Sequence, residues 1–512
     1  MSSCSLGYVV MASLALAACG PREVRRARAT PRPEPPTEER AGPGAKTAFP
    51  TETPGACATL RDVSVSDVVR VEGKTVYYAG TTGGLSIVDA ADAAHPRTLA
   101  TVPFVGNPLA LFVREGLVWV VFVDPDSRSG VDGVATVIRA VDVRNPTAPR
   151  IVGQQVRAGT ARDAKLVGGF LYVLRGEKGR SVVEAFGVNG TKLEVLDEAV
   201  MDGVPAQMAA SPAGLAVVTT DDAHAHVSWL DLSMERPGSL LVRKTVRVTG
   251  GVPTWERGDG QIVDADEGQR VRLVTCATRS CTPSEPASLQ IVDFGFDAPA
   301  RNPMPLRITE HDSSPTTRFG DGVLYVADTP VPGKRNTTLH VVLTDERVPR
   351  FAAHLPLEGR ITALVPHDAS LVALGSTGST DSELKLVVHD VDVQRPATPR
   401  RRSSAIFGSD WTWSIVTDDS RAMSFDPSSE LFAVPFTAWR QADKRYVTGA
   451  QLVDRRPAGG YPTTALPADG WTERAVFLDG HLLTFGPNGV SSIDYASIHQ
   501  PEIGEQPLHI GR

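Results

Sequence analysis

The sequence has few cysteines, few aromatic residues and no excess of positive charge. Its 512 residues include five cysteines, and aromatic residues make up 6%. The formal net charge of −7 argues against a nucleic-acid partner, because a general nucleic-acid binder needs a basic face. No stretch of about 10–15 residues shows a convincing helical period, which excludes a fold of parallel strands joined by helices.

Turn-forming residues are abundant instead. The chain contains 46 glycines and 39 prolines, and valine is frequent, a composition that favours many short strands. Hydrophobic residues make up 41%, which excludes disorder over most of the length. A chain of 512 residues is too long for a single core, so it forms either several domains or one array of repeats.

The N-terminus indicates where the protein is located in the cell. Residues 5–18 form an apolar run that is too short for a permanent membrane span. The run ends in Leu16-Ala17-Ala18-Cys19, which resembles the lipobox of bacterial lipoproteins. The resemblance implies that residues 1–18 are a lipoprotein signal peptide and that Cys19 is lipidated; the alternative is an ordinary signal peptide. Because Gly20 is not aspartate, the resemblance also implies an outer-membrane lipoprotein of a Gram-negative cell envelope.

Residues 19–56 form a tether between this anchor and the body of the protein. They contain eight prolines and almost no large apolar side chain. Such a segment cannot bury enough surface to offset the entropy of ordering it, so we expect a disordered linker. A flexible chain of this length spans roughly 35 Å, which holds the body away from the membrane.

Residues 57–512 repeat one structural unit. VDVRNPTAPR (141–150) and VDVQRPATPR (391–400) agree at six of ten positions, and they lie 250 residues apart. The expected second strands of successive units are spaced by about 51 residues, a period typical of β-propellers with about four strands in each blade. Nine residues mark the middle of these strands: Tyr77, Trp119, Tyr172, Ala216, Arg272, Tyr325, Val372, Phe432 and Leu482.

We therefore expect an all-β propeller of four-stranded antiparallel blades around a central channel. Eight blades are favoured within a range of seven to nine, because residues 252–312 look irregular: QIVDADE and VRLVTC compete there for one strand. Aspartate at the end of a third strand is expected to form an Asx-type turn that leads into proline and the outer strand. Residues 58–63 are expected to add an outer strand to the blade that contains residues 490–495, which closes the ring.

Several segments resemble the family of secreted bacterial proteins known only as the "beta propeller domain" family. LSIVD (85–89) and LQIVD (289–293) resemble its shorter LVIVD-type repeat, and most of residues 57–510 follow the family pattern. The resemblance implies a propeller fold and an extracytoplasmic setting, and it implies no chemistry. The segments that carry it are residues 62–74, 316–327, 421–436, 449–454 and 473–484.

Cysteine and histidine spacing gives one disulfide prediction and no metal site. CATRSC (276–281) suits a local bridge in an oxidising compartment, so we predict a Cys276–Cys281 disulfide. The alternatives are two free thiols, or the pairing of one of them with Cys57. His224 and His226 share one face of a strand and were weighed as a metal pair, but two exposed histidines are the favoured interpretation.

No catalytic signature is present among the sequence motifs of metalloproteases, serine hydrolases or phosphate-binding loops. We therefore assign no catalytic, cofactor or metal residue. Trp411 and Trp413, together with Trp439 and Trp471, could form an aromatic ligand face, although packing within the blades is the favoured interpretation.

Two functions remain for the predicted propeller. The first is a lipid-anchored binding scaffold for a protein or a glycan. The alternative is an enzyme of the cell envelope that acts on a polysaccharide in the central funnel. The fold alone does not decide between them, and the missing catalytic signature favours binding.

Overall fold

A computed structural model describes residues 63–495, with gaps at 65, 127–132, 189–192, 222, 233–237, 253–260, 266–267, 277–287, 296–303, 308–314, 329–335, 345–348, 379–383, 409–410, 442–443, 456–462 and 469. The chain divides into two units, Met1–Thr53 and Pro54–Arg512, and every described residue belongs to the second. The predicted signal peptide, Cys19 and most of the tether lie outside the described residues. None of the helices in these ranges is long and apolar enough to cross a membrane.

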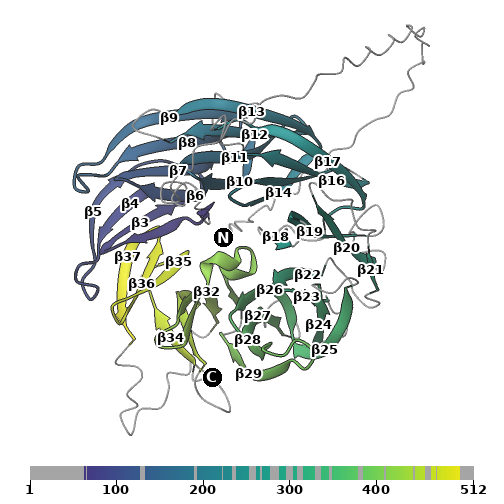
Figure 1. Ribbon diagram of the computed structural model, residues 1–512. Coiled ribbons are helices and arrows are strands. Elements are labelled where there is room, and N and C mark those ends of the chain that lie inside the picture. Colours follow the sequence, from purple (N-terminus) through teal and green to yellow (C-terminus); the bar gives the residue numbers. More distant parts are fainter. Residues whose placement is uncertain are drawn as a thin grey trace, which may run out of the picture. The chain divides into compact units, whose positions relative to one another are not determined.

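The described residues of the second unit form an all-β propeller of nine antiparallel sheets, which we number as blades in chain order (Figure 1). Blade 1 contains β2 (Val69–Glu72), β3 (Thr75–Gly80), β4 (Gly84–Asp89) and β5 (Arg97–Val102). Blade 2 contains β6 (Asn107–Arg114), β7 (Leu117–Asp124), β8 (Ala135–Asp142) and β9 (Arg150–Ala158). Blade 3 contains β10 (Thr160–Val167), β11 (Phe170–Glu177), β12 (Arg180–Gly187) and β13 (Glu194–Asp202), with β1 (Val63–Ser64) added beside β10.

The middle of the chain supplies the next three blades. Blade 4 contains β14 (Val204–Ala210), β15 (Gly214–Thr220), β16 (His224–Asp231) and β17 (Leu241–Thr249). Blade 5 contains β18 (Gln261–Ala265), β19 (Gly268–Cys276), β20 (Ser288–Gly295) and β21 (Met304–Arg307). Blade 6 contains β22 (Thr316–Gly320), β23 (Val323–Ala327), β24 (Asn336–Leu343) and β25 (Arg350–Glu358).

The last three blades include the two short helices of the described residues. Blade 7 contains β26 (Arg360–His367), β27 (Ser370–Thr377), β28 (Lys385–Asp392) and β29 (Arg400–Phe407). Blade 8 contains β30 (Trp411–Trp413), the 3₁₀ helices η3 (Ile415–Thr417) and η4 (Ser420–Ala422), β31 (Ser424–Asp426), β32 (Leu431–Arg440), β33 (Arg445–Asp454) and β34 (Thr463–Pro467). Blade 9 contains β35 (Arg474–Leu478), β36 (His481–Gly486) and β37 (Gly489–Asp494).

The repeat predicted from the sequence is confirmed. The favoured count of eight blades is wrong, because the structure has nine, which lies within the predicted range of seven to nine. All nine residues chosen to mark the second strands lie on the second strand of a blade. Residues 252–312, which were expected to be irregular, form blade 5. QIVDA and the strand that includes VRLVTC do not compete for one place, because they pair with each other as β18 and β19, with Gln261 opposite Arg272.

The predicted turn chemistry is also confirmed. Asp89, Asp142 and Asp392 each end the third strand of a blade. The carboxylate of each accepts a hydrogen bond from the backbone two residues later, at 3.0, 3.1 and 3.1 Å. Proline then directly precedes the outer strand in all three blades, where its missing N–H interrupts no ladder.

Glycine with positive φ marks several passages from one blade to the next. Gly159 (φ 88°) lies between β9 and β10, and Gly203 (φ 90°) lies between β13 and β14. A Cβ on Gly159 would lie 2.0 Å from the carbonyl oxygen of Gly176, so no other residue fits there. Glycine at this position allows the chain to turn sharply from the outer strand of one blade to the inner strand of the next.

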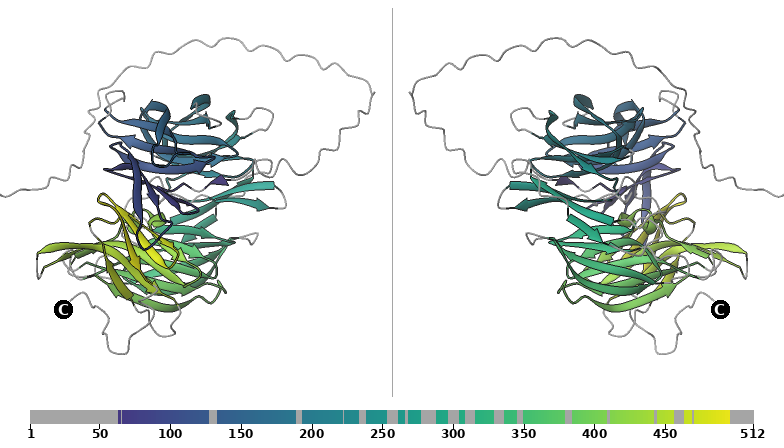
Figure 2. Two further views of the ribbon diagram at one scale, coloured as in Figure 1. Left: turned by 90° about the vertical axis from the view of Figure 1, so that its left-hand side faces the viewer. Right: turned by 90° about the vertical axis from the view of Figure 1, so that its right-hand side faces the viewer.

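Apolar clusters fill every junction between neighbouring blades, including the junction between the last and the first. Leu483 and Phe485 of blade 9 pack in one cluster with Tyr78 and Leu85 of blade 1. Figures 1 and 2 show these two blades, coloured yellow and purple, side by side. The ring is therefore closed, although its two end blades are not consecutive in the chain.

The predicted mode of closure is wrong. β1 does not add a strand to blade 9: it pairs with β10 of blade 3, with Val63 opposite Val167. From there the chain makes a bridge between Asp67 and Leu111 of blade 2 and then enters blade 1 as β2. Residues 58–62 lie outside the described residues. Within the described ranges, blade 9 has three strands, and side chains rather than a shared strand join it to blade 1.

Candidate functional site

Three segments that carry the family resemblance meet in space at the closure of the ring. They are the chain before β2, the segment around η4, and the start of β35. Their charged side chains form one set of ion pairs and hydrogen bonds, which we call the closure network. Its members are Asp67, Asp419, Arg421, Glu473 and Arg474.

Arg474 is the centre of this network. Its guanidinium donates to Asp67 Oδ1 at 3.2 Å, to Asp419 Oδ2 at 2.6 Å and to the backbone oxygen of Glu473 at 2.9 Å. Only 4% of the arginine is exposed, so these bonds are shielded from water. One side chain of blade 9 thus joins the chain before blade 1 to the helical segment of blade 8.

Asp419 is placed by a local capping motif. It is the N-cap of η4, and its carboxylate accepts from the backbone nitrogen of Arg421 at 3.2 Å. The guanidinium of Arg421 binds both oxygens of the same carboxylate at 2.7 Å and also donates to the backbone oxygen of Ser66 at 2.7 Å. The capping motif therefore ties η4 to the segment that leads into blade 1.

Glu473 bridges blade 9 and blade 1 directly. It accepts from the Tyr78 hydroxyl at 2.6 Å and from Thr81 Oγ1 at 2.8 Å. Burial, followed by the negative charge of Glu473 and this hydrogen bond, raises the pKa of Tyr78 far above its usual range. Tyr78 therefore stays a neutral donor and Glu473 stays an acceptor.

Opposing effects act on the charged groups around η4. Burial alone would lower the pKa of Arg421, but the hydrogen bonds and charge of Asp419 outweigh it and the pKa is raised. Burial, followed by the charge of Asp419, raises the pKa of Asp418. Burial lowers the pKa of Arg70, against the opposing charge of Asp67. The network thus holds its arginines and Asp419 as charged pairs that support each other.

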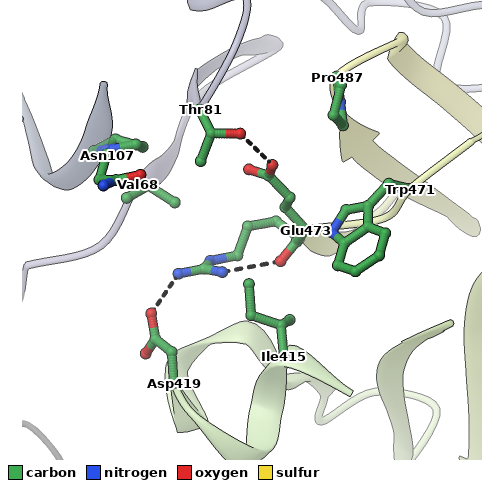
Figure 3. A pocket seen from close by; sticks show the side chains of 10 residues that line it. Val68, Thr81, Asn107, Ile415, Asp419, Trp471, Glu473 and Pro487 are labelled. Carbon is green, nitrogen blue, oxygen red and sulfur yellow. Dashed lines mark hydrogen bonds and ion pairs between the residues drawn. The ribbon is translucent and has the colours of Figure 1, made fainter. Parts of the chain in front are cut away.

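A cavity of about 540 Å³ opens beside the closure network (Figure 3). Trp471 lies on its wall next to Glu473, and 41% of this tryptophan is exposed. The lining combines an apolar half with a polar half. Its residues are Val68, Thr81, Asn107, Pro108, Ile415, Asp419, Trp471, Glu473, Arg474 and Pro487.

The predicted aromatic face is brought together only in part. Trp413 packs against Trp471 with ring centroids 5.4 Å apart, so one of the two tryptophans predicted as a ligand face supports the cavity wall. Trp411 lies opposite Trp439 in the β30–β32 ladder, and Trp439 in turn packs against Tyr446 at 4.9 Å. Neither Trp411 nor Trp413 lines the cavity.

The remaining predicted site residues are placed as follows. Cys276 is fully buried and disulfide-bonded; its partner lies outside the described residues, so pairing with Cys281 stays a prediction. His224 and His226 both contact Asp221, at 3.3 and 2.9 Å. Across the described ranges, no group of three or more histidine, cysteine or acidic side chains could hold a metal ion.

Comparison with known proteins agrees with the architecture. Residues 339–465 match the model of the family described as "Beta propeller domain". No curated protein matches the chain.

Among solved structures, the chain is similar to the Dos1 propeller, with 12% identity, a TM-score of 0.44, and coverage of 82% of this chain and 88% of that one. It is similar to the β-propeller domain of the Trilobed protease from Pyrococcus furiosus, with 10% identity, a TM-score of 0.36, and coverage of 71% and 99%. A functionally unknown protein from Desulfotomaculum acetoxidans gives 9% identity, a TM-score of 0.36, and coverage of 70% and 95%. The described residues form an all-β propeller of nine blades, and residues 339–465 match the beta propeller domain family model.

Proposed function

We propose that the protein is a lipid-anchored, extracytoplasmic propeller that binds a glycan in the cavity beside its closure network. The observation that carries the proposal is Trp471, an exposed indole that faces a cavity rimmed by hydrogen-bonding groups. An indole in the wall of a concave site offers an apolar platform for the C–H face of a sugar ring.

The polar half of the cavity suits the hydroxyl groups of a sugar. Asn107 offers an amide donor and acceptor, and Thr81 offers a hydroxyl. Asp419 and Glu473 add carboxylate acceptors that their partners already hold in place. A cavity of about 540 Å³ also lies within the usual range for small-molecule sites, about 300–1,000 Å³.

The hydrogen bonds that hold Asp419 and Glu473 favour binding of a glycan over its hydrolysis. Asp419 is engaged by Arg421 and Arg474, and Glu473 is engaged by Tyr78 and Thr81. A general acid for glycoside hydrolysis needs a carboxyl group with a raised pKa that can release a proton toward the substrate. Carboxylates that accept hydrogen bonds from arginine and tyrosine are suited to recognition.

The anchoring part of the proposal rests on the lipobox-like segment before Cys19. Replacement of Cys19 by alanine should leave the protein without lipid and away from the outer membrane. Metabolic labelling with an alkyne fatty acid measures this directly. Equal labelling of the parent and the Cys19→Ala variant would contradict the anchoring proposal.

A glycan microarray probed with the full-length mature protein tests the binding proposal. We expect a bound glycan and at least tenfold weaker binding by Trp471→Ala, with a cooperative thermal unfolding transition that shows this variant to be folded. Tyr446→Ala is the matched control: this aromatic residue is 65% exposed and does not line the cavity. Absence of any bound glycan, or equal binding by Trp471→Ala and the parent, would overturn the proposal.

A further inference from the structure

Blade 6 brings together two histidines that the sequence did not single out. His340 on β24 lies directly opposite His354 on β25. Their Nδ1 atoms are 2.8 Å apart and the ring planes are nearly perpendicular, at 86°. The two nitrogen atoms are therefore close enough to bind the same ion at the surface of the outer strands.

We propose that His340 and His354 bind one copper(II) ion through their Nδ1 atoms, with water completing the coordination. This site is separate from the cavity beside the closure network and does not depend on the proposed function. His354 is exposed, which leaves room for the water ligands.

Asp328 orients the first ligand. Its carboxylate lies 3.4 Å from Nε2 of His340 and accepts from the backbone nitrogen of Thr338 at 2.5 Å. With the proton of His340 on Nε2, facing Asp328, the lone pair of Nδ1 is directed at His354. A carboxylate behind a histidine in this way is the usual support of a metal-binding imidazole.

Aromatic packing holds both ligands in place. The ring of Phe351 lies 5.9 Å from His340 and 5.6 Å from His354 and so restricts both imidazoles.

The spacing of the two nitrogens favours one coordination geometry. Metal–imidazole bonds are about 2.0–2.1 Å long. Two such bonds to nitrogens 2.8 Å apart enclose an angle of about 84–89°, whereas a tetrahedral angle needs roughly 3.3–3.4 Å. An angle near 90° belongs to square-planar or tetragonal sites, which suit Cu(II) and Ni(II), and Cu(II) binds more tightly.

The other histidine pair, His224 and His226, is a matched control. Its ring centroids are 6.3 Å apart, Nε2 of His226 contacts Asp221, and Nδ1 of His224 contacts Asp221 and Arg247. Because these nitrogens already have partners and do not face each other, this pair should not bind copper.

Copper(II) titration of the tag-free full-length protein, followed by electron paramagnetic resonance, tests the proposal. We expect the parent to take up one ion more than the His340→Ala/His354→Ala variant, with hyperfine coupling to two nitrogens. Asp328→Asn should weaken that site by about 10–100-fold. His224→Ala/His226→Ala should bind like the parent, and unchanged melting temperatures show that each variant is folded.

Two results would overturn the proposal. If the parent and the His340→Ala/His354→Ala variant take up the same amount of copper, the ion binds elsewhere. If the parent takes up none, the contact between the imidazoles is a hydrogen bond only.

Discussion

The junction between blades 2 and 3 and the junction between blades 9 and 1 are held in different ways. The first is continuous in the chain through Gly159, and its cluster of buried residues is apolar, with Phe112, Trp119 and Phe186 at most 2% exposed. The second joins distant parts of the chain, and buried polar bonds from Glu473 supplement its apolar cluster. Polar bonds also cross the first junction, where Arg157 of blade 2 pairs with the buried Glu184 of blade 3 at 3.0 Å. The difference is that, among the described residues, the second junction is held by side chains alone.

Truncation in the apolar junction should give the largest loss. Phe186→Ala removes a fully buried ring and leaves a cavity, so we expect the free energy of unfolding to fall by about 3–5 kcal/mol. Urea-induced unfolding measures the loss. Val200→Ala on the neighbouring strand is the control, because Val200 is 50% exposed and should change stability by at most about 0.5 kcal/mol.

Removal of the central arginine should give the next largest loss and test the polar junction. Arg474→Ala removes the guanidinium that Asp67 binds and one of the two arginines that hold Asp419. We expect the free energy of unfolding to fall by about 2–4 kcal/mol, less than for a fully buried pair because both carboxylates are partly exposed.

Lys74→Ala is the control for Arg474→Ala at the same junction. Lys74 pairs with Asp479 in an exposed position, where ion pairs contribute about 0–1 kcal/mol. Equal losses in the two variants would show that burial of the network does not matter for closure.

A tyrosine between blades 8 and 9 should give a smaller effect that depends on pH. Tyr495 donates to Asp426 at 2.8 Å; burial, followed by this bond, raises the pKa of Tyr495 to about 12. A raised pKa stabilises the folded state fully below pH 10, the range of an unfolded tyrosine, and the contribution is lost as pH rises toward 12. The difference in melting temperature between the parent and Tyr495→Phe should therefore be constant below pH 10 and shrink as the pH rises from 10 toward 12. A difference that does not vary with pH would refute this reading.

The repeat could be predicted from the sequence because local chemistry determines it. The apolar strands recur in each unit, and aspartate and proline follow the third strand in blades 1, 2 and 7. These patterns placed all nine second strands correctly. The location of β1 could not be predicted in this way. A two-residue strand has little preference of its own, and its partner on β10 is decided by contacts across the ring.

The candidate site was only partly predictable for the same reason. Trp471 and Trp413 were noticed as tryptophans, and their contact follows from the ring. Asp67, Asp419 and Arg474 are far apart in the sequence and become neighbours only when the ring closes. The resemblance marked the segments that contain Asp67 and Arg474, and a third that begins two residues after Asp419, but a charged residue in or near such a segment has no special pattern around it.

Zero-length carbodiimide cross-linking of the native protein tests closure by side chains most directly. The reagent joins a lysine amine to a carboxylate only when the two are in contact, and Lys74 of blade 1 pairs with Asp479 of blade 9. We predict a cross-linked peptide between these residues, identified by mass spectrometry, that is missing from the Asp479→Asn variant. Absence of this peptide from a digest of the parent in which the carbodiimide has modified other exposed carboxylates would contradict a ring closed between blades 9 and 1.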